Sequence, residues 1–266
     1  MKTTLENKIE KLKKNGYDIS VNKIITDGFL AWKNTIFYGI FCVIFTYIFN
    51  NLIYNLLSNY LGTNLIDLEL AKAISSLNND SQSLQKLISL FQDYIHNPQI
   101  IIKTLLSSLI GLLLYPLSAG VVYCAYLADK KGNTSFKHFI SGYQGTKFIK
   151  LIGLVFIQII LISISMLLLF IPALYIIPAF ILAGSFIIID DAPIIQAIKY
   201  SFIIVNRKFG KIFLILMISF FISKFLGFLM CIIGLIFTLS FSQAIVYSIY
   251  KNTVGSIDVD DEINEN

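Results

Sequence analysis

The acidic pair Asp190-Asp191 and the two histidines are the residues whose types could do chemistry. Two neighbouring carboxylates can work as a general acid and base, and histidine can serve as a base or as a metal ligand. His96 and His138 are the only histidines, and the charge pattern described below predicts them on opposite sides of a membrane. They therefore cannot share a metal or build the paired-base arrangement of hydrolases.

No catalytic motif accompanies these residues. The sequence contains no GxSxG, HExxH, Walker-type loop or Cys/His cluster. Cys42, Cys124 and Cys231 lie in apolar runs without metal-ligand spacing, so we expect them to pack as small hydrophobic side chains. We predict that the chain is not an enzyme and has no catalytic, cofactor-binding or metal-binding residues. One carboxylate, such as Asp190, acting on a lipid headgroup is the remaining enzymatic alternative.

The sequence DDAPIIQAIKYSF favours a structural role for the acidic pair. An aspartate before a helix can accept hydrogen bonds from the first free N–H groups, and proline suits the first helical turn. Negative charge also complements the positive end of the helix dipole. We therefore predict that Asp190 and Asp191 cap the helix that follows them.

Composition places these residues in a membrane protein. The chain has 56% apolar and 14% charged residues, against about 45–50% and 25% in soluble domains. The first apolar run begins only at Ile36, too late for a cleavable signal, so we expect the chain to be kept whole. The predicted fold is an all-α polytopic bundle that forms one membrane domain, 1–266.

Six apolar runs are long enough to cross the hydrocarbon core of a membrane. A span needs roughly 20 predominantly apolar residues. The predicted transmembrane helices are Ile36–Leu57, Leu105–Leu127, Phe148–Phe170, Ala173–Ile189, Ile212–Met230 and Ile232–Tyr250.

The distribution of positive charge predicts orientation. Most of the 21 Lys and Arg residues lie in the leader 1–35, in 128–150 and in 190–211, whereas the loop 58–103 has few. Positive segments stay on the cytoplasmic side. We therefore predict a multi-pass protein of the bacterial inner (cytoplasmic) membrane with both termini in the cytoplasm.

Each basic segment also carries apolar residues at helical spacing. Val21–Trp32, Phe136–Tyr143 and Ile194–Val205 read as amphipathic helices that lie flat at the inner leaflet. The bilayer, with its anionic headgroups, is their expected partner. The residues predicted at the membrane interface are Phe29, Trp32, Lys33, Phe139, Tyr143, Phe202, Arg207 and Lys208.

Two spans resemble each other in sequence. LSAGVVYCAY, which starts at Leu117, matches FSQAIVYSIY, which starts at Phe241, and pairs Ser118 with Ser242 and Val122 with Val246. This indicates three pseudo-repeats, each an interfacial helix followed by a hairpin. After the leader 1–35, the units are 36–127, 128–189 and 190–251, and an acidic tail, 252–266, is expected to be disordered.

The stretch IPALYIIPAFILAGSFIIIDDAPIIQAIKYSFIIVNRKFGKIFLILMISF resembles the core of a broad family of bacterial six-span membrane proteins of uncharacterised function. That family includes the membrane domain attached to some glycerophosphodiester phosphodiesterases. The family's usual glycine after the hairpin proline is Ala173 here, and a common proline is Ser240. No phosphodiesterase domain is present, so the resemblance implies no such activity. The matching positions are Pro172, Asp190, Asp191, Ala197, Ser201 and Gly210.

Polar residues inside the spans are few. We expect Lys103 and Lys224 to extend to the outer headgroups. A second group, expected to hydrogen-bond between helices, comprises Asn50, Asn51, Asn55, Gln158 and Gln243.

The outer loop 58–103 contains two amphipathic helical patterns, LIDLELAKAISSL and LQKLISLFQDYI. They form either a cap on the bundle or a docking surface for an envelope protein. Basic residues that face lipid do not indicate nucleic-acid binding. We predict a non-enzymatic membrane scaffold, assembly or envelope-homeostasis partner; the alternative is a transport-related permease or an accessory subunit of a transporter.

Overall fold

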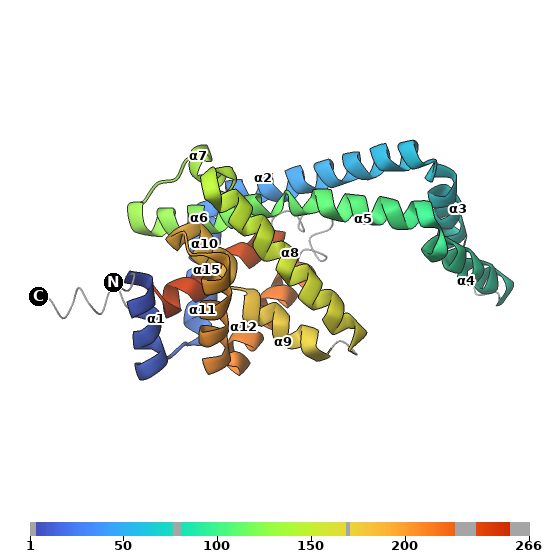
Figure 1. Ribbon diagram of the computed structural model, residues 1–266. Coiled ribbons are helices and arrows are strands. Elements are labelled where there is room, and N and C mark those ends of the chain that lie inside the picture. Colours follow the sequence, from blue (N-terminus) through green and yellow to red (C-terminus); the bar gives the residue numbers. More distant parts are fainter. Residues whose placement is uncertain (1–3, 77–80, 169–170, 227–237, 256–266) are drawn as a thin grey trace, which may run out of the picture. The chain divides into compact units, whose positions relative to one another are not determined.

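The chain is mostly helical in the part that the structure describes, residues 4–76, 81–168, 171–226 and 238–255 of a computed structural model (Figure 1). No strand occurs in these ranges, which confirms the predicted all-α class. Where the sequence predicts one domain, the contacts separate two compact units. Unit 1 comprises Met1–Ile44 and Tyr115–Asn266, and unit 2 comprises Phe45–Leu114.

Unit 1 holds most of the helices. It begins with α1 (Thr4–Asn15) and the first part of α2 (Val21–Leu61). The chain returns to unit 1 with α6 (Tyr115–Lys131), α7 (Phe136–Phe139), the 3-10 turn η1 (Ser141–Tyr143), α8 (Gly145–Leu167), α9 (Ile171–Phe180), α10 (Ala183–Asp190), α11 (Ile194–Arg207), α12 (Phe209–Phe221), the π-helical turn η2 (Ile222–Leu226) and α15 (Phe241–Thr253).

Helix α10 lies at the centre of unit 1. Every residue from Ala183 to Ile188 is buried, because α10 contacts α6, α8, α11 and α15. An apolar sequence with no polar face is what such a position requires.

Four helical segments among the described residues are long and apolar enough to cross a membrane, as expected for a membrane protein. They are Val21–Leu61, Pro98–Lys131, Gly145–Ser165 and Pro172–Asp190. The third and fourth confirm apolar helices within the predicted spans Phe148–Phe170 and Ala173–Ile189, apart from 169–170, which lie outside the described residues. The fifth and sixth predicted spans fall partly on 227–237, outside the described residues.

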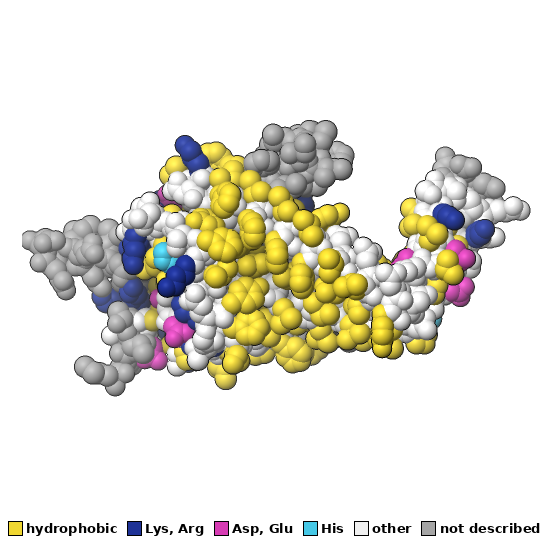
Figure 2. Space-filling model, turned by 90° about the horizontal axis from the view of Figure 1, so that it is seen from above, with side chains coloured by type: hydrophobic (Ala, Val, Ile, Leu, Met, Phe, Trp, Pro, Cys, Tyr) yellow, Lys and Arg dark blue, Asp and Glu magenta, His cyan; other side chains and the backbone are white. Residues whose placement is uncertain are grey.

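The helices of unit 1 expose apolar side chains on their outer faces. Ile149 is 70% exposed on α8, and Phe220 and Phe221 are both more than half exposed on α12. Figure 2 shows apolar side chains over one broad face, with Lys and Arg gathered beside it at one end of unit 1. Water penalises such a surface, whereas lipid does not.

The predicted flat helix Val21–Trp32 is not a separate element, and this corrects the sequence interpretation. Helix α2 runs without a break from Val21 to Leu61, and its 41 residues are about twice the roughly 20 that a span needs. No glycine-proline or turn signal interrupts the sequence after Trp32. The inner face of this segment packs on α15: Ile24 is fully buried, and Gly28 lies against Ile245.

The other two predicted interfacial helices also pack inside unit 1. Ala197, Ser201 and Val205 of α11 are fully buried, so this helix face meets protein and not lipid. The middle segment forms only the four-residue α7 and the turn η1. Its Phe139, predicted at the membrane interface, is fully buried, because its backbone lies directly against Gly120.

The remaining predicted interface residues differ in exposure. Phe29, Lys33, Tyr143 and Arg207 are exposed, whereas Trp32, Phe202 and Lys208 are half-buried. The Trp32 indole N–H donates to Ser240 Oγ at 2.9 Å. Some of these aromatic and basic residues therefore pack against protein, and the others are exposed.

The basic segments contact one another at one end of unit 1. Lys211 Nζ donates to Asp18 Oδ1 at 3.0 Å, joining the 190–211 segment to the leader. Lys251 Nζ lies 2.7 Å from Asp129 Oδ1, joining the end of α15 to the end of α6. With the Lys150–Asp191 pair, ion pairs connect the leader 1–35 and the segments 128–150 and 190–211, which the charge count assigns to one side of the membrane.

Asp190 and Asp191 do not cap α11 as predicted, because Pro193 occupies its N-cap position. Asp191 ends the preceding helix, α10, with a left-handed backbone (φ 54°), and the Ala192 N–H bonds back to the Phe186 carbonyl. Asp191 pairs with Lys150 at 2.7 Å, and Asp190 accepts a hydrogen bond from the Tyr250 hydroxyl at 2.8 Å. The acidic pair therefore joins α8, α10 and α15.

Unit 2 contains the rest of α2, α3 (Asn64–Ser75), α4 (Ser81–His96) and α5 (Pro98–Leu112). This confirms the two helices predicted in the outer loop. Helix α5 ends at Leu112, so the predicted span Leu105–Leu127 is two helices, α5 and α6, separated by a turn at Leu113 and Leu114.

Candidate functional site

The fourth candidate span is broken in its middle. Pro178 lies inside α9, which ends at Phe180, and α10 begins at Ala183. Proline lacks the N–H that a helix needs and crowds the preceding turn. The Ile181 N–H donates to the Pro178 carbonyl at 3.1 Å. This bond joins residues three apart, as in a 3-10 turn, where an α-helix joins residues four apart.

Ser201 of α11 satisfies the backbone groups that this break releases. Its hydroxyl donates to the Ala179 carbonyl at 2.7 Å and accepts from the Leu182 N–H at 3.2 Å. Ser201 is fully buried. In an apolar interior an unpaired backbone group is costly, so this one side chain stabilises the interrupted helix.

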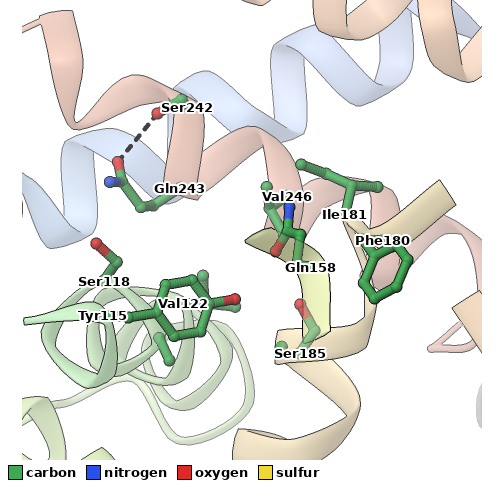
Figure 3. A pocket seen from close by; sticks show the side chains of 12 residues that line it. Tyr115, Ser118, Val122, Gln158, Phe180, Ile181, Ser185, Ser242, Gln243 and Val246 are labelled. Atoms are coloured by element: carbon green, nitrogen blue, oxygen red, sulfur yellow. Dashed lines mark hydrogen bonds between the residues drawn. The ribbon is translucent and has the colours of Figure 1, made fainter. Parts of the chain in front are cut away.

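A cavity of about 280 Å³ opens beside the break, inside unit 1. Its walls come from α6, α8, the α9–α10 break and α15 (Figure 3). The residues that line it are Tyr115, Ser118, Ala119, Val122, Gln158, Phe180, Ile181, Gly184, Ser185, Ser242, Gln243 and Val246. Among the described residues, no side chain that lines this cavity carries a charge at neutral pH.

Three polar side chains of this cavity have no hydrogen-bond partner among the described residues. The Ser185 hydroxyl is buried without a partner, and neither Gln158 nor Tyr115 bonds to another described group. Gln158 lies near the middle of α8. In Figure 3 the Tyr115 hydroxyl points toward the side on which Ser185 and Gln158 lie. Of the three, Ser185 is buried, whereas Tyr115 and Gln158 are half-buried at the cavity wall. Because buried polar groups are normally paired, the Ser185 hydroxyl fits a ligand or ordered water, and the other two groups face the same space.

Gly184 sets the position of Tyr115. A Cβ atom on Gly184 would lie 2.5 Å from the Tyr115 hydroxyl oxygen. Only a glycine therefore allows the phenol to rest directly on α10, which keeps the cavity open beside Ser185.

The sequence repeat falls on this cavity. Ser118 and Val122 of α6, and their repeat counterparts Ser242 and Val246 of α15, all line it. Helices α6 and α15 pack against each other, and Tyr126 meets Tyr247 with ring centroids 6.5 Å apart. The repeat was therefore one sequence signal that fell on this site, together with the polar residues Gln158 and Gln243.

Sequence reasoning interpreted the amides differently. Gln158 and Gln243 were expected to hydrogen-bond between helices, but Gln158 makes no such bond to the described residues and Gln243 bonds to Ser242 of its own helix. Ser185 and Tyr115 gave no signal, because a serine and a tyrosine in an apolar run are ordinary helix residues. None of the residues predicted at the membrane interface lines the cavity.

Unit 2 contains a second polar centre, the Lys103 cluster, which consists of Lys103, Asp67, Tyr54, Ser58 and Tyr94. Lys103 Nζ lies 2.7 Å from Asp67 Oδ2, and the lysine side chain is fully buried. Lys103 also donates to Tyr54 at 2.9 Å and to Ser58 at 3.2 Å. This corrects the expectation that Lys103 extends to the headgroups: its charge is neutralised inside unit 2.

The Lys103 cluster joins all four helices of unit 2 and perturbs the titration of Asp67. Burial opposes ionisation of this carboxyl, but hydrogen bonds from Lys103, Ser58 and Tyr94 outweigh it and lower the Asp67 pKa. Burial and the hydrogen bonds to Tyr54 and Asp67 raise the pKa of Tyr94. Every side chain of the cluster has a partner, so its role is to hold α2, α3, α4 and α5 together.

The two histidines make local hydrogen bonds. The His96 ring bonds to the Gln92 carbonyl at 2.8 Å, and His138 Nδ1 accepts from the Ser135 N–H at 3.2 Å in a capping box. Within the described ranges, no group of three or more His, Cys, Asp or Glu side chains comes together. Cys42 and Cys124 are buried, and Cys231 lies outside the described residues.

No family model, curated protein or solved structure matches this chain. The resemblance to the membrane domain associated with glycerophosphodiester phosphodiesterases therefore stays a prediction.

Proposed function

We propose that this chain is a transport-related protein of the bacterial cytoplasmic membrane, either a permease or an accessory subunit of a transporter. The observation that supports this is the cavity beside the break between α9 and α10, into which the unpaired Ser185 hydroxyl opens. Many transporters bind their substrates between helices at points where a membrane helix is interrupted.

The alternative of a purely structural interior accounts less well for the polar groups. Burying the unpaired Ser185 hydroxyl costs free energy, and the half-buried Gln158 and Tyr115 place two further unpaired polar groups on the same cavity. Apolar residues at Gln158 and Ser185 would close the same space more stably. A ligand that pairs with these groups explains why they are present.

The proposed orientation has both termini in the cytoplasm. Positive segments favour the cytoplasmic side, and the leader 1–35 and the basic segments 128–150 and 190–211 form ion pairs at one end of unit 1. The six-span count and the three pseudo-repeats belong to the same proposal.

Cysteine accessibility tests whether the cavity is open to small molecules. In full-length protein with Cys42, Cys124 and Cys231 changed to alanine, Ser185→Cys is treated with a small water-soluble thiosulfonate in oriented membrane vesicles. The matched control is Ser248→Cys, since Ser248 is fully buried on α15 and outside the cavity. We expect labelling at position 185 and not at 248. Equal protection of both positions would contradict the proposed function.

A second candidate is the role of scaffold, assembly or envelope-homeostasis partner, and a row of exposed apolar residues on α4 favours it. Leu84, Ile88, Phe91 and Ile95 are each about half exposed and follow helical spacing along one face. An exposed apolar face of this kind suits the docking of a partner protein.

Co-purification tests the second candidate. Proteins that accompany the wild type in mild detergent should be lost with the double variant Ile88→Ser/Phe91→Ser. The control is Leu65→Ser on α3, a residue that is 72% exposed outside this row. An unchanged set of accompanying proteins would exclude docking at the α4 row.

A further inference from the structure

We infer that the unit 1 cavity binds an uncharged polyhydroxy group, which a free polyol or the sugar headgroup of a lipid can supply. The inference rests on the proposed function, because it names the ligand class of the same cavity. Three features of the lining carry it: the absence of charge, the mixture of donors and acceptors, and the apolar faces between them.

The first feature excludes charged ligands. None of the 12 lining residues is Asp, Glu, Lys, Arg or His. An ion inside an apolar bundle needs an opposite charge or a metal to replace its water, and ionisable residues mark the paths of ions through membranes. A phosphate, a carboxylate or an ammonium group would have no counter-charge in this lining.

The second feature selects hydroxyl groups. The Ser185 and Tyr115 hydroxyls can each donate and accept, and the Gln158 amide has two donor hydrogens and one acceptor oxygen. A ligand with acceptors only, such as an ether, would leave part of this set unpaired. Each hydroxyl of a polyol both donates and accepts, so it can satisfy neighbouring groups of either kind.

The third feature is the apolar surface between the polar groups. Val122 and Val246 form repeat-related walls, and Phe180 and Ile181 line the break. Such side chains pack against the C–H faces of a polyol chain or sugar ring. The cavity volume of about 280 Å³ leaves room for one such group.

The test uses protection of a cavity cysteine in the full-length protein. Ser118→Cys, in the background without native cysteines, reports on the cavity without removing Ser185, Gln158 or Tyr115. Its alkylation rate is measured after reconstitution in phosphatidylcholine vesicles. The probes are glycerol and erythritol, with glycine betaine at the same osmolality as the charged comparison.

We expect both polyols to slow alkylation and glycine betaine to leave it unchanged. Ser185→Ala and Gln158→Leu should each raise the polyol concentration for half-protection about twofold to tenfold, as expected for one lost hydrogen bond. Gln92→Leu, an exposed change on α4, should leave it unchanged.

A second set of vesicles separates the two sources of the polyhydroxy group. These contain a glycosyl diacylglycerol in addition to phosphatidylcholine. Protection by this lipid alone, weakened by the same two variants, supports the inference with a headgroup as the ligand. Protection by neither polyol nor glycolipid, or equal protection by glycine betaine, overturns it.

A different experimental result would show that the proposed function itself is wrong. A Ser118→Cys that no reagent reaches in the folded protein, while the unfolded protein reacts, shows a closed interior and overturns both proposals. A residue that reacts freely but is not protected by polyols overturns only the ligand class.

Discussion

Lys103 Nζ lies 2.7 Å from Asp67 Oδ2, with the lysine side chain fully buried and the aspartate side chain 22% exposed. The two residues come from α5 and α3, which the sequence separates by 36 positions. Their pairing is what allows a lysine to sit inside unit 2, because an isolated buried ammonium would be strongly destabilising.

Removing one partner of this pair should destabilise the protein. We expect Lys103→Met or Asp67→Asn to lower the free energy of unfolding by about 3 kcal/mol, because each leaves a charge or polar group without its partner. The double variant Lys103→Met/Asp67→Asn should lose much less than the sum of the two. Denaturant titrations in detergent measure these values, and Lys86→Met, an exposed change on α4, is the control. Additive losses would show that the pair is not coupled.

The stability of unit 2 should fall in acid. The Asp67 pKa is lowered below its ordinary value of 3.8, so the folded state binds this proton less readily than the unfolded chain. The stabilisation is therefore complete above the ordinary pKa and is lost as the pH falls through the lowered one. Unfolding measured from about pH 5 to about pH 3 should show this loss in the wild type and a smaller slope in Asp67→Asn. Identical slopes would remove Asp67 from the explanation.

Two buried serines near the helix break should respond oppositely to loss of the hydroxyl. Ser201→Ala leaves the Ala179 carbonyl and the Leu182 N–H without their partner, so we expect a loss of about 1–3 kcal/mol. Ser185→Ala removes a hydroxyl that has no partner, so stability should stay unchanged or rise slightly. Thermal unfolding of both variants in the same detergent makes the comparison, and a larger loss for Ser185→Ala would contradict the assignment of the break.

Gly120 should tolerate no side chain. A Cβ atom there would overlap the Phe139 carbonyl oxygen, which is backbone and cannot rotate away. We expect Gly120→Ala to cost about 1–3 kcal/mol through overpacking. Gly210→Ala on α12, where a Cβ meets no atom within 4 Å, should be neutral or slightly stabilising. Equal stability of the two variants would show that α7 can move away from α6.

Gly184→Ala should close the cavity without unfolding the protein. Its Cβ would collide with the end of the Tyr115 side chain, which can rotate into the cavity. The expected result is slower alkylation of Ser118→Cys with a nearly unchanged melting temperature. Gly210→Ala in the same reporter background should leave the rate unchanged.

Periodic apolar patterns identified the helices, but they could not show which residues far apart in the sequence pair with each other. The helices of the outer loop and the apolar segments at 148–170 and 173–189 follow from local sequence, and the structure confirms them. The burial of Lys103 depends on Asp67, and nothing in the residues around Lys103 indicates that partner. Without a visible partner, the position of Lys103 near the end of a predicted span favoured the prediction that it extends to the headgroups.

The interfacial helices show a second limit of sequence reasoning. A helix with one apolar face suits a membrane surface and a protein surface equally well, because the pattern gives the face and not what covers it. Ile24 and Ala197 lie on faces that protein covers. The continuity of α2 was also hidden, since the polar residues before Ile36 resemble a boundary although no helix-breaking residue occurs there.

The central position of α10 has a consequence for the order in which the chain is made. Its neighbours α6 and α8 are synthesised before it, but α11 and α15 follow it, and 61% of the most apolar stretch of this candidate span is buried. A nascent chain that has only reached Asp190 presents that surface, and the broken backbone beside Ala179, to lipid without the serine that completes it. The interior of unit 1 therefore closes only when the last described helix has left the ribosome.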